Sequence, residues 1–449
     1  MTWSKRYGKL RRASYDTAPV LMRWLYTLAL YLLLPWALLH LLLRSRRQPA
    51  YLQHVAERFG VFAERVQAPL IWIHAVSVGE TRAAEPLIKA LKESHPRHRI
   101  LLTHATPTGR QTGIDLFGDS VSRTYLPYDW PFAARRFLRH FRPEIGIIME
   151  TEIWPNLIAQ SSRMKLPVHL VNARMSARSA KGYARFGGLT RTALRQLSGV
   201  AAQTERDAGR LRELGAPDVI VTGNIKFDRS APPQMLELGR RLRSQFGDRR
   251  SVFLAASTRD GEEAMILDAL AHSGLPGNLL TVIVPRHPQR FDEVAAMMKQ
   301  RGLNFRRRSE NAVVEAEAGY LLGDSMGEMF AYYAACDVAF IGGSLLPLGG
   351  QNLLEACAVG KPVIVGPHTF NFEEATRDAI EAGAAVRVSN AAELVTTLQS
   401  LLNDPARCAG MSEAGRRFTD KHRGATERTL ALLSVPLLSN SLPPGERGF

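Results

Sequence analysis

The sequence predicts an α/β protein made of two successive arrays of parallel strands and helices, preceded by a membrane-anchor helix. Short apolar runs alternate with helical patterns from Pro69 onward, which is typical of a parallel sheet covered by helices on both faces. The alternation breaks once, at the proline-containing stretch 229–234, and then restarts. We therefore expect an anchor segment at 1–47, an α/β domain at 48–228, a linker at 229–248, and a second α/β domain with a C-terminal tail at 249–449.

The predicted anchor is an uncharged run at 24–43, WLYTLALYLLLPWALLHLLL, in which Pro35 is tolerated as a kink. About 20 apolar residues are what a helix needs to cross a bilayer. The run ends in the basic stretch 44–47 rather than in a small-residue cleavage site, so we expect it to be retained. A helix lying in the membrane interface is the alternative, and basic residues on both flanks leave the orientation open.

The charge of the chain also favours a membrane surface as a partner. Lys and Arg number 58 against 42 Asp and Glu, a net charge of +16, and half of this excess lies within residues 1–47. Charges that bracket an apolar run suit anionic lipids. Nucleic-acid binding is disfavoured because no recognition motif or zinc knuckle is present. The three cysteines are widely spaced, which supports neither a disulfide framework nor a zinc site and favours a reducing, cytoplasmic compartment.

The candidate functional residues follow the predicted strands, because ligands in open α/β sheets bind beyond the carboxyl ends of strands. In the first array we expect strands at 70–75, 100–103, 144–149, 168–171, 199–202 and 219–221. In the second array we expect them at 252–256, 281–284, 319–322, 338–341, 362–365 and 384–388.

Three loops of the first array carry candidates. Glu80 follows the first strand at a helix start, where it is either a general base toward a hydroxyl or an ordinary helix N-terminal acid. Glu150 and Glu152 close another strand, and either position an acceptor or cap the next helix. Lys226 follows the last strand, where it meets a carboxylate or phosphate or is a solvated loop lysine. His74 and His104 are more typical of strand cores than of metal ligands.

The second array offers features of a phosphate and nucleotide site. Ser257 and Thr258 join a strand to a helix, and the Arg286 guanidinium suits a phosphate or carboxylate. Glu355 lies one helical turn after Asn352 and suits ribose hydroxyls.

A further anion seat is expected where Asp324 or Ser325 caps a helix. That cap would leave the backbone amides of Met326, Gly327 and Glu328 available to an anion. Each of these features is weak alone, but together they would line one edge of one sheet, as a nucleotide site does.

In this order, nine segments of the chain resemble signatures of the Kdo (3-deoxy-D-manno-octulosonic acid) transferase family. The resemblance covers residues 20–430, anchor included. The segments are IWIHAVSVGE (71–80), ETEIWPN (150–156), TGNIKFD (222–228), AAST with GEE (255–263), PRH (285–287), SMGEM (325–329), GGS (342–344), GGQNLLEA (349–356) and GPHTFNF (366–372).

The resemblance implies a GT-B fold, in which two Rossmann-like domains face a cleft. It implies an inverting reaction that needs no metal or other cofactor and moves Kdo from CMP-Kdo to lipid IVA, a lipid A precursor, in lipopolysaccharide core biosynthesis. It places the enzyme among the phospholipids of the inner membrane, with its catalytic domains in the cytoplasm and no nucleic acid as a partner.

The resemblance also gives roles to the candidates. Glu80 matches the general base, and Glu150 and Glu152 match an acceptor-side motif. The positions that match donor binding are Ser257, Thr258, Arg286, Met326, Gly327, Glu328, Asn352, Glu355 and Lys226.

One position departs from the family pattern, and two rival functions stay open. Arg259 stands where the resemblance leads us to expect histidine after the Ser-Thr pair; if that histidine contributes to donor binding, arginine must serve as a replacement cation, and the role of Arg259 stays open. The nearest rival is another membrane-associated GT-B transferase that uses a UDP-sugar and a lipid acceptor. A nucleotide-sugar epimerase of similar fold would not need the predicted anchor.

Overall fold

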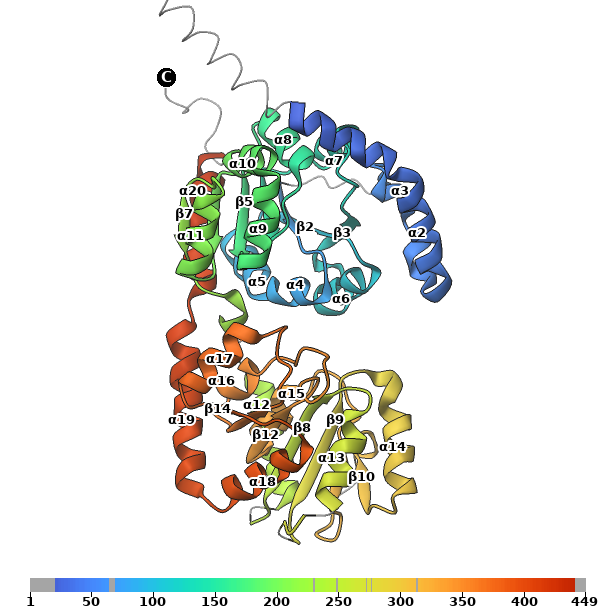
Figure 1. Cartoon of the computed structure of the whole chain (residues 1–449), viewed down its shortest axis with the longest axis vertical. Coiled ribbons are helices and arrows are strands. Elements are labelled where there is room, and N and C mark those ends of the chain that lie inside the picture. Colours follow the sequence, from blue (N-terminus) through green and yellow to red (C-terminus); the bar gives the residue numbers. More distant parts are fainter. Residues whose placement is uncertain are drawn as a thin grey trace, which may run out of the picture. The chain divides into compact units, whose positions relative to one another are not determined.

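The protein, seen here in a computed structural model, divides into two compact units (Figure 1). The first comprises Met1–Asp228 and Arg423–Phe449, and the second comprises Arg229–His422. The structure describes residues 21–63, 69–228, 231–247, 249–271, 273–275, 277–311 and 314–440. The basic N-terminus before residue 21 and the tail after residue 440 lie outside the described residues.

The first unit is built on a seven-stranded, all-parallel sheet of order β3-β2-β1-β4-β5-β6-β7. Its strands are β1 (Leu70–His74), β2 (Arg99–His104), β3 (Ser122–Tyr125), β4 (Ile145–Met149), β5 (Val168–Ala173), β6 (Gly199–Ala202) and β7 (Val219–Val221). The six expected strands are all present. Sequence reasoning missed β3, an edge strand whose sequence, SRTY, carries no apolar run.

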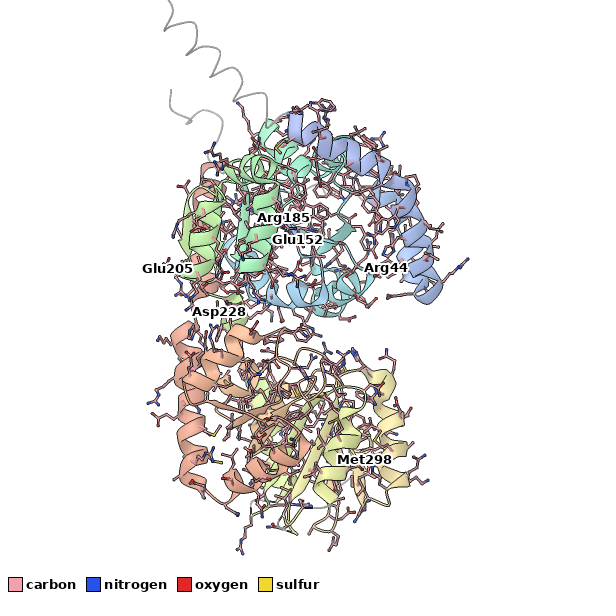
Figure 2. The ribbon with its side chains drawn as sticks, viewed as in Figure 1. Arg44, Glu152, Arg185, Glu205, Asp228 and Met298 are labelled. Atoms are coloured by element: carbon pink, nitrogen blue, oxygen red, sulfur yellow. The ribbon has the colours of Figure 1, made fainter. Side chains whose placement is uncertain are left out.

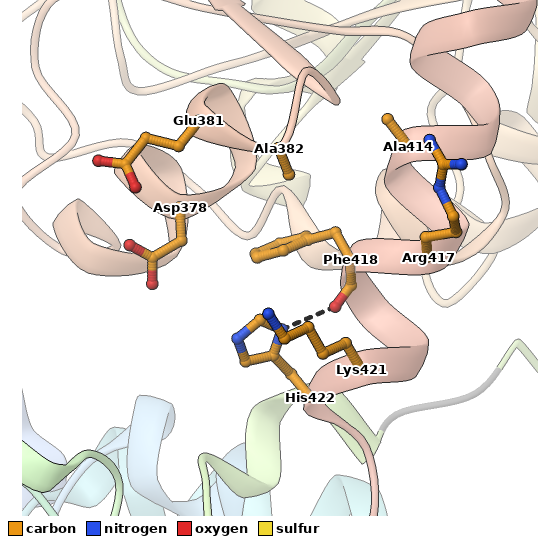
Figure 3. A pocket seen from close by; sticks show the side chains of 8 residues that line it. All are labelled: Asp378, Glu381, Ala382, Ala414, Arg417, Phe418, Lys421 and His422. Carbon is orange, nitrogen blue, oxygen red and sulfur yellow. Dashed lines mark hydrogen bonds between the residues drawn. The ribbon is translucent and has the colours of Figure 1, made fainter.

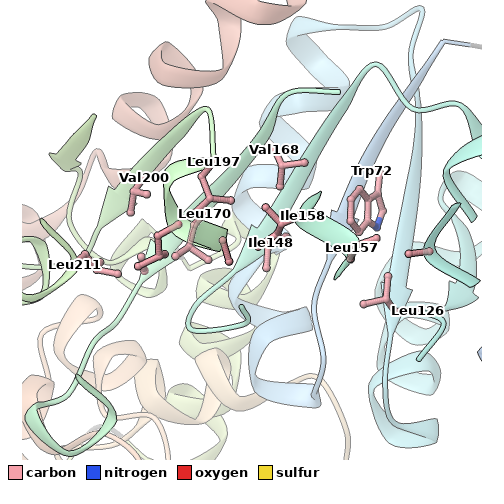
Figure 4. Close-up of a cluster of buried hydrophobic side chains, with 14 of the residues drawn as sticks. Trp72, Leu126, Ile148, Leu157, Ile158, Val168, Leu170, Leu197, Val200 and Leu211 are labelled. Atoms are coloured by element: carbon pink, nitrogen blue, oxygen red, sulfur yellow. The ribbon is translucent and has the colours of Figure 1, made fainter. Parts of the chain in front are cut away.

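Apolar residues on alternate strand positions face opposite sides of this sheet, because successive strand side chains point to opposite faces. Leu70 and Trp72 belong to the core cluster under α7 (Pro131–Phe141), α8 (Pro155–Arg163), α10 (Gly187–Arg195) and α11 (Glu205–Glu213), part of which is drawn in Figure 4. Ile71 and Ile73 belong to the cluster under α4 (Val78–Ala83), α5 (Glu85–Ser94), α6 (Pro107–Phe117) and α20 (Ala425–Asn440).

The second unit repeats this plan with a parallel sheet of order β10-β11-β9-β8-β12-β13-β14. The strands are β8 (Val252–Thr258), β9 (Leu280–Pro285), β10 (Phe305–Arg307), β11 (Tyr320–Leu322), β12 (Val338–Ile341), β13 (Val363–Val365) and β14 (Ala385–Arg387). Again the expected strands are present and an edge strand was missed, since β10 reads FRR. The core of one face packs under α13 (Glu262–Ala271), α14 (Phe291–Gln300) and α18 (Ala391–Leu402).

The unit boundaries differ from the expected domain boundaries at two places. The expected linker, 229–248, holds α12 (Pro233–Phe246), which packs on α15 (Met329–Ala335) within the second unit. The C-terminal helix α20 returns to the first unit, where Leu433 is fully buried and the Asp228 carboxylate accepts a hydrogen bond from the Gly424 amide at 2.7 Å. Sequence periodicity reveals the apolar face of a helix but not the sheet that the face covers.

Residues of the predicted anchor form a helix at Leu21–Leu32 that continues into α2 (Leu34–Arg47) with a bend of 48° next to Pro35. Within the described part of the chain, no single helix has both the length and the apolarity to cross a membrane. Only the two helices of this bent pair, taken together, have that length and apolarity. The structure therefore shows a bent apolar helix but does not show an anchor.

The packing of α12 gives a test with a matched control. A Cβ atom at Gly239 would lie 2.4 Å from the Ala334 Cβ and 2.9 Å from the Ala331 carbonyl, whereas nothing lies within 4 Å of one at Gly209 in α11. We expect Gly239→Ala to destabilise the protein by about 1–3 kcal/mol through overpacking. Gly209→Ala should stabilise it by roughly 0.5–1 kcal/mol through helix propensity. Denaturant unfolding followed by circular dichroism measures both, and equal effects would contradict the close packing of α12 on α15.

Candidate active site

Glu80 lies in the first turn of α4, the helix that follows β1, and takes part in capping it. Ser77 is the N-cap residue, and its side-chain oxygen accepts a hydrogen bond from the Glu80 amide. The Glu80 carboxylate in turn accepts from the Val76 amide at 2.6 Å and from the Ser77 hydroxyl at 3.2 Å. This reciprocal arrangement is close to a capping box, so the structural interpretation of Glu80 holds.

The same carboxylate has the acidity that a general base at neutral pH requires. Burial raises the pKa of Glu80 to about 7, although the hydrogen bond from the Val76 amide opposes the shift. The neighbouring carboxylates Glu150 and Glu152 raise this pKa further. A base is most effective when its pKa lies near the working pH. Capping and catalysis are therefore compatible in this residue.

Glu150 and Lys226 meet in the first unit as an ion pair. The Lys226 ammonium lies 2.8 Å from the Glu150 carboxylate, and both side chains are about three-quarters buried, with 25% and 21% exposed. Lys226 belongs to the short helix η3 (Ile225–Asp228), whose end at Asp228 is labelled in Figure 2. The resemblance groups Lys226 with the donor-binding residues, whereas in the structure its ion pair is with Glu150, which the resemblance assigns to the acceptor side.

Two backbone features accompany this ion pair. Glu150 has a positive φ of 58°, an uncommon conformation for a residue with a side chain. The fully buried Asn172, which follows the apolar stretch of β5, accepts a hydrogen bond from the Ile225 amide at 3.0 Å and so holds the start of η3. Sequence reasoning missed Asn172, although a polar residue at the carboxyl end of a buried strand is the signal that identified the others.

Glu152 lies in the loop between β4 and α8 and is labelled in Figure 2. Burial raises the pKa of Glu152, and Glu150 raises it further. The loop is held by the Thr151 hydroxyl, which donates to the Arg174 carbonyl at 2.9 Å, and by the Tyr183 hydroxyl, which donates to the Thr151 carbonyl at 3.0 Å. Glu80, Glu150 and Glu152 thus form one electrostatically coupled cluster at the carboxyl edge of the first sheet.

In the second unit, most candidates follow β11, β9, β8 and β12, which are neighbours in the sheet. Glu262, which is fully buried, holds the loops after β8 and β12 together. Its carboxylate accepts hydrogen bonds from the Arg259 and Leu345 amides, both at 2.9 Å, and from the Gly343 amide. Glu262 lies in the family-like segment 255–263, but no role was expected for it from the sequence.

Thr258 and Ser257 have different surroundings. Thr258 is fully buried and its hydroxyl donates to the Glu263 carboxylate at 2.7 Å, which in turn pairs with Arg290 at 2.7 Å. The Thr258 hydroxyl is therefore engaged in holding the loop. Ser257 is only partly buried and has a positive φ of 57°, so the backbone turns sharply at the end of β8.

Arg286 lies at the end of β9 near Arg259 and Arg290, and Arg290 is paired with the carboxylates of Asp260, Glu263 and Glu293. Its side chain donates to the neutral amide of Gln351 at 3.2 Å, and its backbone amide donates to the Thr258 carbonyl at 2.9 Å. Burial lowers the pKa of the adjacent His287, and the charges of Arg259, Arg286 and Arg290 lower it further. Such a field favours an anionic ligand, and it includes the arginine that departs from the family pattern.

The expected helix cap after β11 is wrong. The α15 helix begins only at Met329, and neither Asp324 nor Ser325 caps it. Asp324 instead pairs with Arg307 at 2.6 Å and accepts from the Ser309 amide at 2.8 Å. A charged partner and a backbone donor outside the helix outcompete its N-terminus for this carboxylate.

The remaining donor-side candidates lie in turns before short helices or in the first turn of one. Met326 and Gly327 belong to a turn that precedes α15, with Met326 55% exposed. The Glu328 carboxylate binds Arg308 at 3.0 Å and accepts from the Ser325 hydroxyl at 2.6 Å. Glu355, in α16 (Leu354–Ala358), accepts from the Asn352 side-chain amide at 3.3 Å.

His74 and His104 are fully buried within the first sheet. Burial lowers the pKa of His74 to about 3 and that of His104 to about 4, which makes both neutral at physiological pH. Across the described ranges, no group of three or more His, Cys, Asp or Glu side chains is arranged to hold a metal ion.

A pocket of about 420 Å³ lies elsewhere in the second unit, between α17 (Glu373–Glu381) and α19 (Pro405–His422) (Figure 3). None of the candidate site residues lines it. Its lining residues are Asp378, Glu381, Ala382, Ala414, Arg417, Phe418, Lys421 and His422.

Comparison with known proteins agrees with this architecture. Residues 53–229 match the family model of 3-deoxy-D-manno-octulosonic-acid transferase (kdotransferase), and residues 299–418 match that of glycosyl transferases group 1. A solved structure of UDP-GlcNAc 2-epimerase from Neisseria meningitidis, 15% identical, aligns with a TM-score of 0.55 over 82% of this chain and 100% of its own, which shows a shared fold.

Two curated relatives extend the match to nearly the whole chain. The 3-deoxy-D-manno-octulosonic acid transferase of Bordetella pertussis is 47% identical over 92% of this chain and 98% of its own length. That of Haemophilus influenzae is 40% identical over 93% of this chain and 99% of its own length. The chain is therefore a glycosyltransferase of GT-B type and belongs to the 3-deoxy-D-manno-octulosonic acid transferase family.

Proposed function

We propose that this transferase moves Kdo from CMP-Kdo to lipid IVA with inversion, and that Glu80 is the general base. The observation that carries the proposal is the position of Glu80 at the carboxyl end of β1, with a pKa raised to about 7 by burial. Glu150 and Glu152 add negative charge beside it, which increases its affinity for a proton.

In the proposed reaction, the Glu80 carboxylate takes the proton of an acceptor hydroxyl. That oxygen forms a bond to the anomeric carbon of Kdo while the bond from this carbon to the CMP phosphate breaks. CMP leaves with the electron pair. A base that acts as the nucleophile attacks raises the rate typically by a factor of about 10²–10⁴.

The second unit supplies groups suited to the donor. CMP-Kdo carries a phosphate and a sugar carboxylate, and Arg286 lies with Arg259 in a field of positive charge. A guanidinium binds such groups bidentately and stabilises the charge that develops on the leaving phosphate. We assign Ser257, Thr258 and the turn at Met326, Gly327 and Glu328 to the phosphate side of the donor. We assign Asn352 and Glu355 to its ribose side. Thr258, Glu328 and Glu355 act there through the hydrogen bonds described above.

The acceptor proposal rests on the first unit. Its carboxylate cluster suits hydroxyl activation, and the apolar helix at 21–47 suits an acceptor that resides in a bilayer. We infer that the enzyme acts at the cytoplasmic face of the inner membrane. The rival, transfer from a UDP-sugar to a lipid, predicts turnover with uridine donors and none with CMP-Kdo.

The pH dependence of transfer tests the base. Glu80 is active when deprotonated, so kcat/KM should fall about tenfold per pH unit below an apparent pKa of about 7 and level off above it. Glu80→Gln should abolish this dependence and lower the rate by roughly a hundredfold or more. The assay follows Kdo transfer by mass spectrometry with purified enzyme, CMP-Kdo, lipid IVA and EDTA.

Ser77→Ala is the matched control, because it removes the helix cap and keeps the base. It should cost about 1 kcal/mol of stability. It should also shift the pH midpoint upward, since the Ser77 hydroxyl favours the charged form of Glu80. If Ser77→Ala lowers the rate at the plateau as much as Glu80→Gln does, Glu80 acts by capping and the proposed base is wrong.

The donor site is tested by removing the Arg286 guanidinium. Arg286→Ala should raise the KM for CMP-Kdo roughly tenfold or more, as expected for losing a hydrogen bond to a charged group. The KM for lipid IVA should stay unchanged. Arg301→Ala, which removes a guanidinium paired with Asp268 at 3.0 Å near the end of α14, is the control and should leave both constants unaltered. Equal effects of the two substitutions would contradict a donor role for Arg286.

A further inference from the structure

The helix at 21–47 has an apolar outward face and carries polar side chains on its inward face. This is the reverse of a helix on the surface of a water-soluble domain. Its less exposed positions recur at helical spacing and include polar residues. They are Arg23, Tyr26, Thr27, Leu30, Leu34, Ala37, His40, Leu41 and Ser45. The outward face is apolar and aromatic, with Leu32 73%, Trp24 66% and Trp36 62% exposed. An apolar face of this size in contact with water is unfavourable, and a bilayer is the solvent that it fits.

Buried polar contacts hold the inward face on the first unit. The Tyr26 hydroxyl donates to the Asp129 carboxylate at 3.0 Å, and the Asn156 side-chain amide donates to the Thr27 oxygen at 3.0 Å. Asp129 and Asn156 are almost fully buried, with 4% and 2% exposed. Asp129 also accepts from the Asn156 and Leu157 amides at 3.0 and 2.7 Å. These four side chains, Tyr26, Thr27, Asp129 and Asn156, form what we call the helix lock.

The lock acts at the acceptor-side loop. Asn156 is the second residue of α8, the helix that follows Glu150 and Glu152 directly, and Asp129 binds the first amides of that helix. Further along the helix, the partly exposed Tyr31 stacks on Trp130 with ring centroids 5.9 Å apart. A displacement of the helix at 21–32 would therefore disturb the start of α8.

These contacts favour a helix that lies in the membrane plane over one that crosses the membrane. Contacts with residues 129–188 extend from Met22, whose sulfur lies against Gly188, to Tyr31, a length of about 14 Å along the domain surface, and Leu41 is buried further along the helix. A crossing helix needs about 20 residues surrounded by lipid. Exposed Arg44 and Arg46 at one end, together with Arg163 at the end of α8 and Lys165 just after it, supply the charge that anionic headgroups attract.

We propose that Tyr26 and Thr27 are positioning residues. They lock the apolar helix in the plane of an anionic bilayer and thereby hold the Glu150–Glu152 loop at a fixed depth relative to a lipid acceptor. The proposal rests on the proposed lipid acceptor. It predicts that the lock matters when the acceptor is embedded in a bilayer and not when detergent presents it.

The test compares Tyr26→Phe/Thr27→Val in the full-length chain with the unsubstituted chain. Kdo transfer to lipid IVA is measured in phosphatidylethanolamine–phosphatidylglycerol vesicles and in detergent micelles. We expect about a tenfold loss of kcat/KM in vesicles, as for two lost hydrogen bonds, and an unchanged value in micelles. Vesicle flotation should stay unchanged, because the apolar face is intact.

Two further variants keep the comparison interpretable. Tyr31→Phe removes a hydroxyl from the same helix outside the lock and should behave as the unsubstituted chain in both media. Tyr26→Phe alone is the milder change, for use if thermal melting shows that the double variant is unfolded, and should give a smaller loss confined to vesicles.

Other outcomes would overturn the proposal. Unchanged transfer in vesicles would show that the lock does not position the acceptor loop. Equal loss in both media would show that it only supports the fold of the site. If the unsubstituted chain transfers Kdo in neither medium, the proposed donor and acceptor fail, and the positioning role fails with them; transfer in micelles alone would uphold the chemistry and contradict the positioning role.

Discussion

Carboxylates that accept hydrogen bonds from backbone amides hold the loops at the carboxyl edges of both sheets in place. Each sheet is parallel and buried on both faces, so its loops can carry chemistry only at the strand ends, where backbone donors lack ladder partners. Glu80 binds the Val76 amide, Glu262 binds three loop amides, and Asp129 binds the first amides of α8. A buried carboxylate is costly unless it is hydrogen-bonded, and these donors offset that cost. The positions of the functional side chains depend on these contacts.

The same constraint explains why the acidic cluster of the first unit is unusual. Glu150 is neutralised by Lys226 at 2.8 Å, whereas Glu80 and Glu152 are buried beside it and have raised pKa values. The three carboxylates therefore have different environments: Glu150 forms an ion pair, whereas burial raises the pKa values of Glu80 and Glu152. Two carboxylates with different environments can take different roles in one reaction.

Much of the fold could be predicted from the sequence, because buried parallel strands are continuous apolar runs. Every strand of that kind was found, and the two that were missed, β3 and β10, are edge strands rich in arginine and other polar residues. The return of α20 to the first unit could not be predicted, since its apolar residues would suit either sheet. The bend beside Pro35 was expected, but the side chains that dock the helix, Tyr26 and Thr27, look unremarkable in a run of leucines.

The loops that form the candidate site could be predicted from the sequence, but most contacts between their side chains could not. Residues after neighbouring strands were expected at one edge, and Glu80, Glu150 and Glu152 do interact there. Local sequence did not reveal which partner each polar side chain would choose. Asp324 precedes a helix and was expected to cap it, yet it binds Arg307 and Ser309, which come from the neighbouring strand β10 and the short helical turn after it. Choices of this kind depend on tertiary neighbours that spacing along the chain does not encode.

Glu80 and Glu262 occupy corresponding places, each at the start of the helix that follows a central strand of its sheet. Burial raises the pKa of both, but their partners differ. Glu262 is fully buried and its oxygens are engaged by three backbone donors from two loops, so it cannot take a proton from a ligand without releasing those loops. Glu80 has one backbone donor and one hydroxyl donor, remains partly exposed, and lies beside two other carboxylates. Of these two equivalent acids, only Glu80 can exchange a proton while the surrounding loops stay in place, which is what a general base requires.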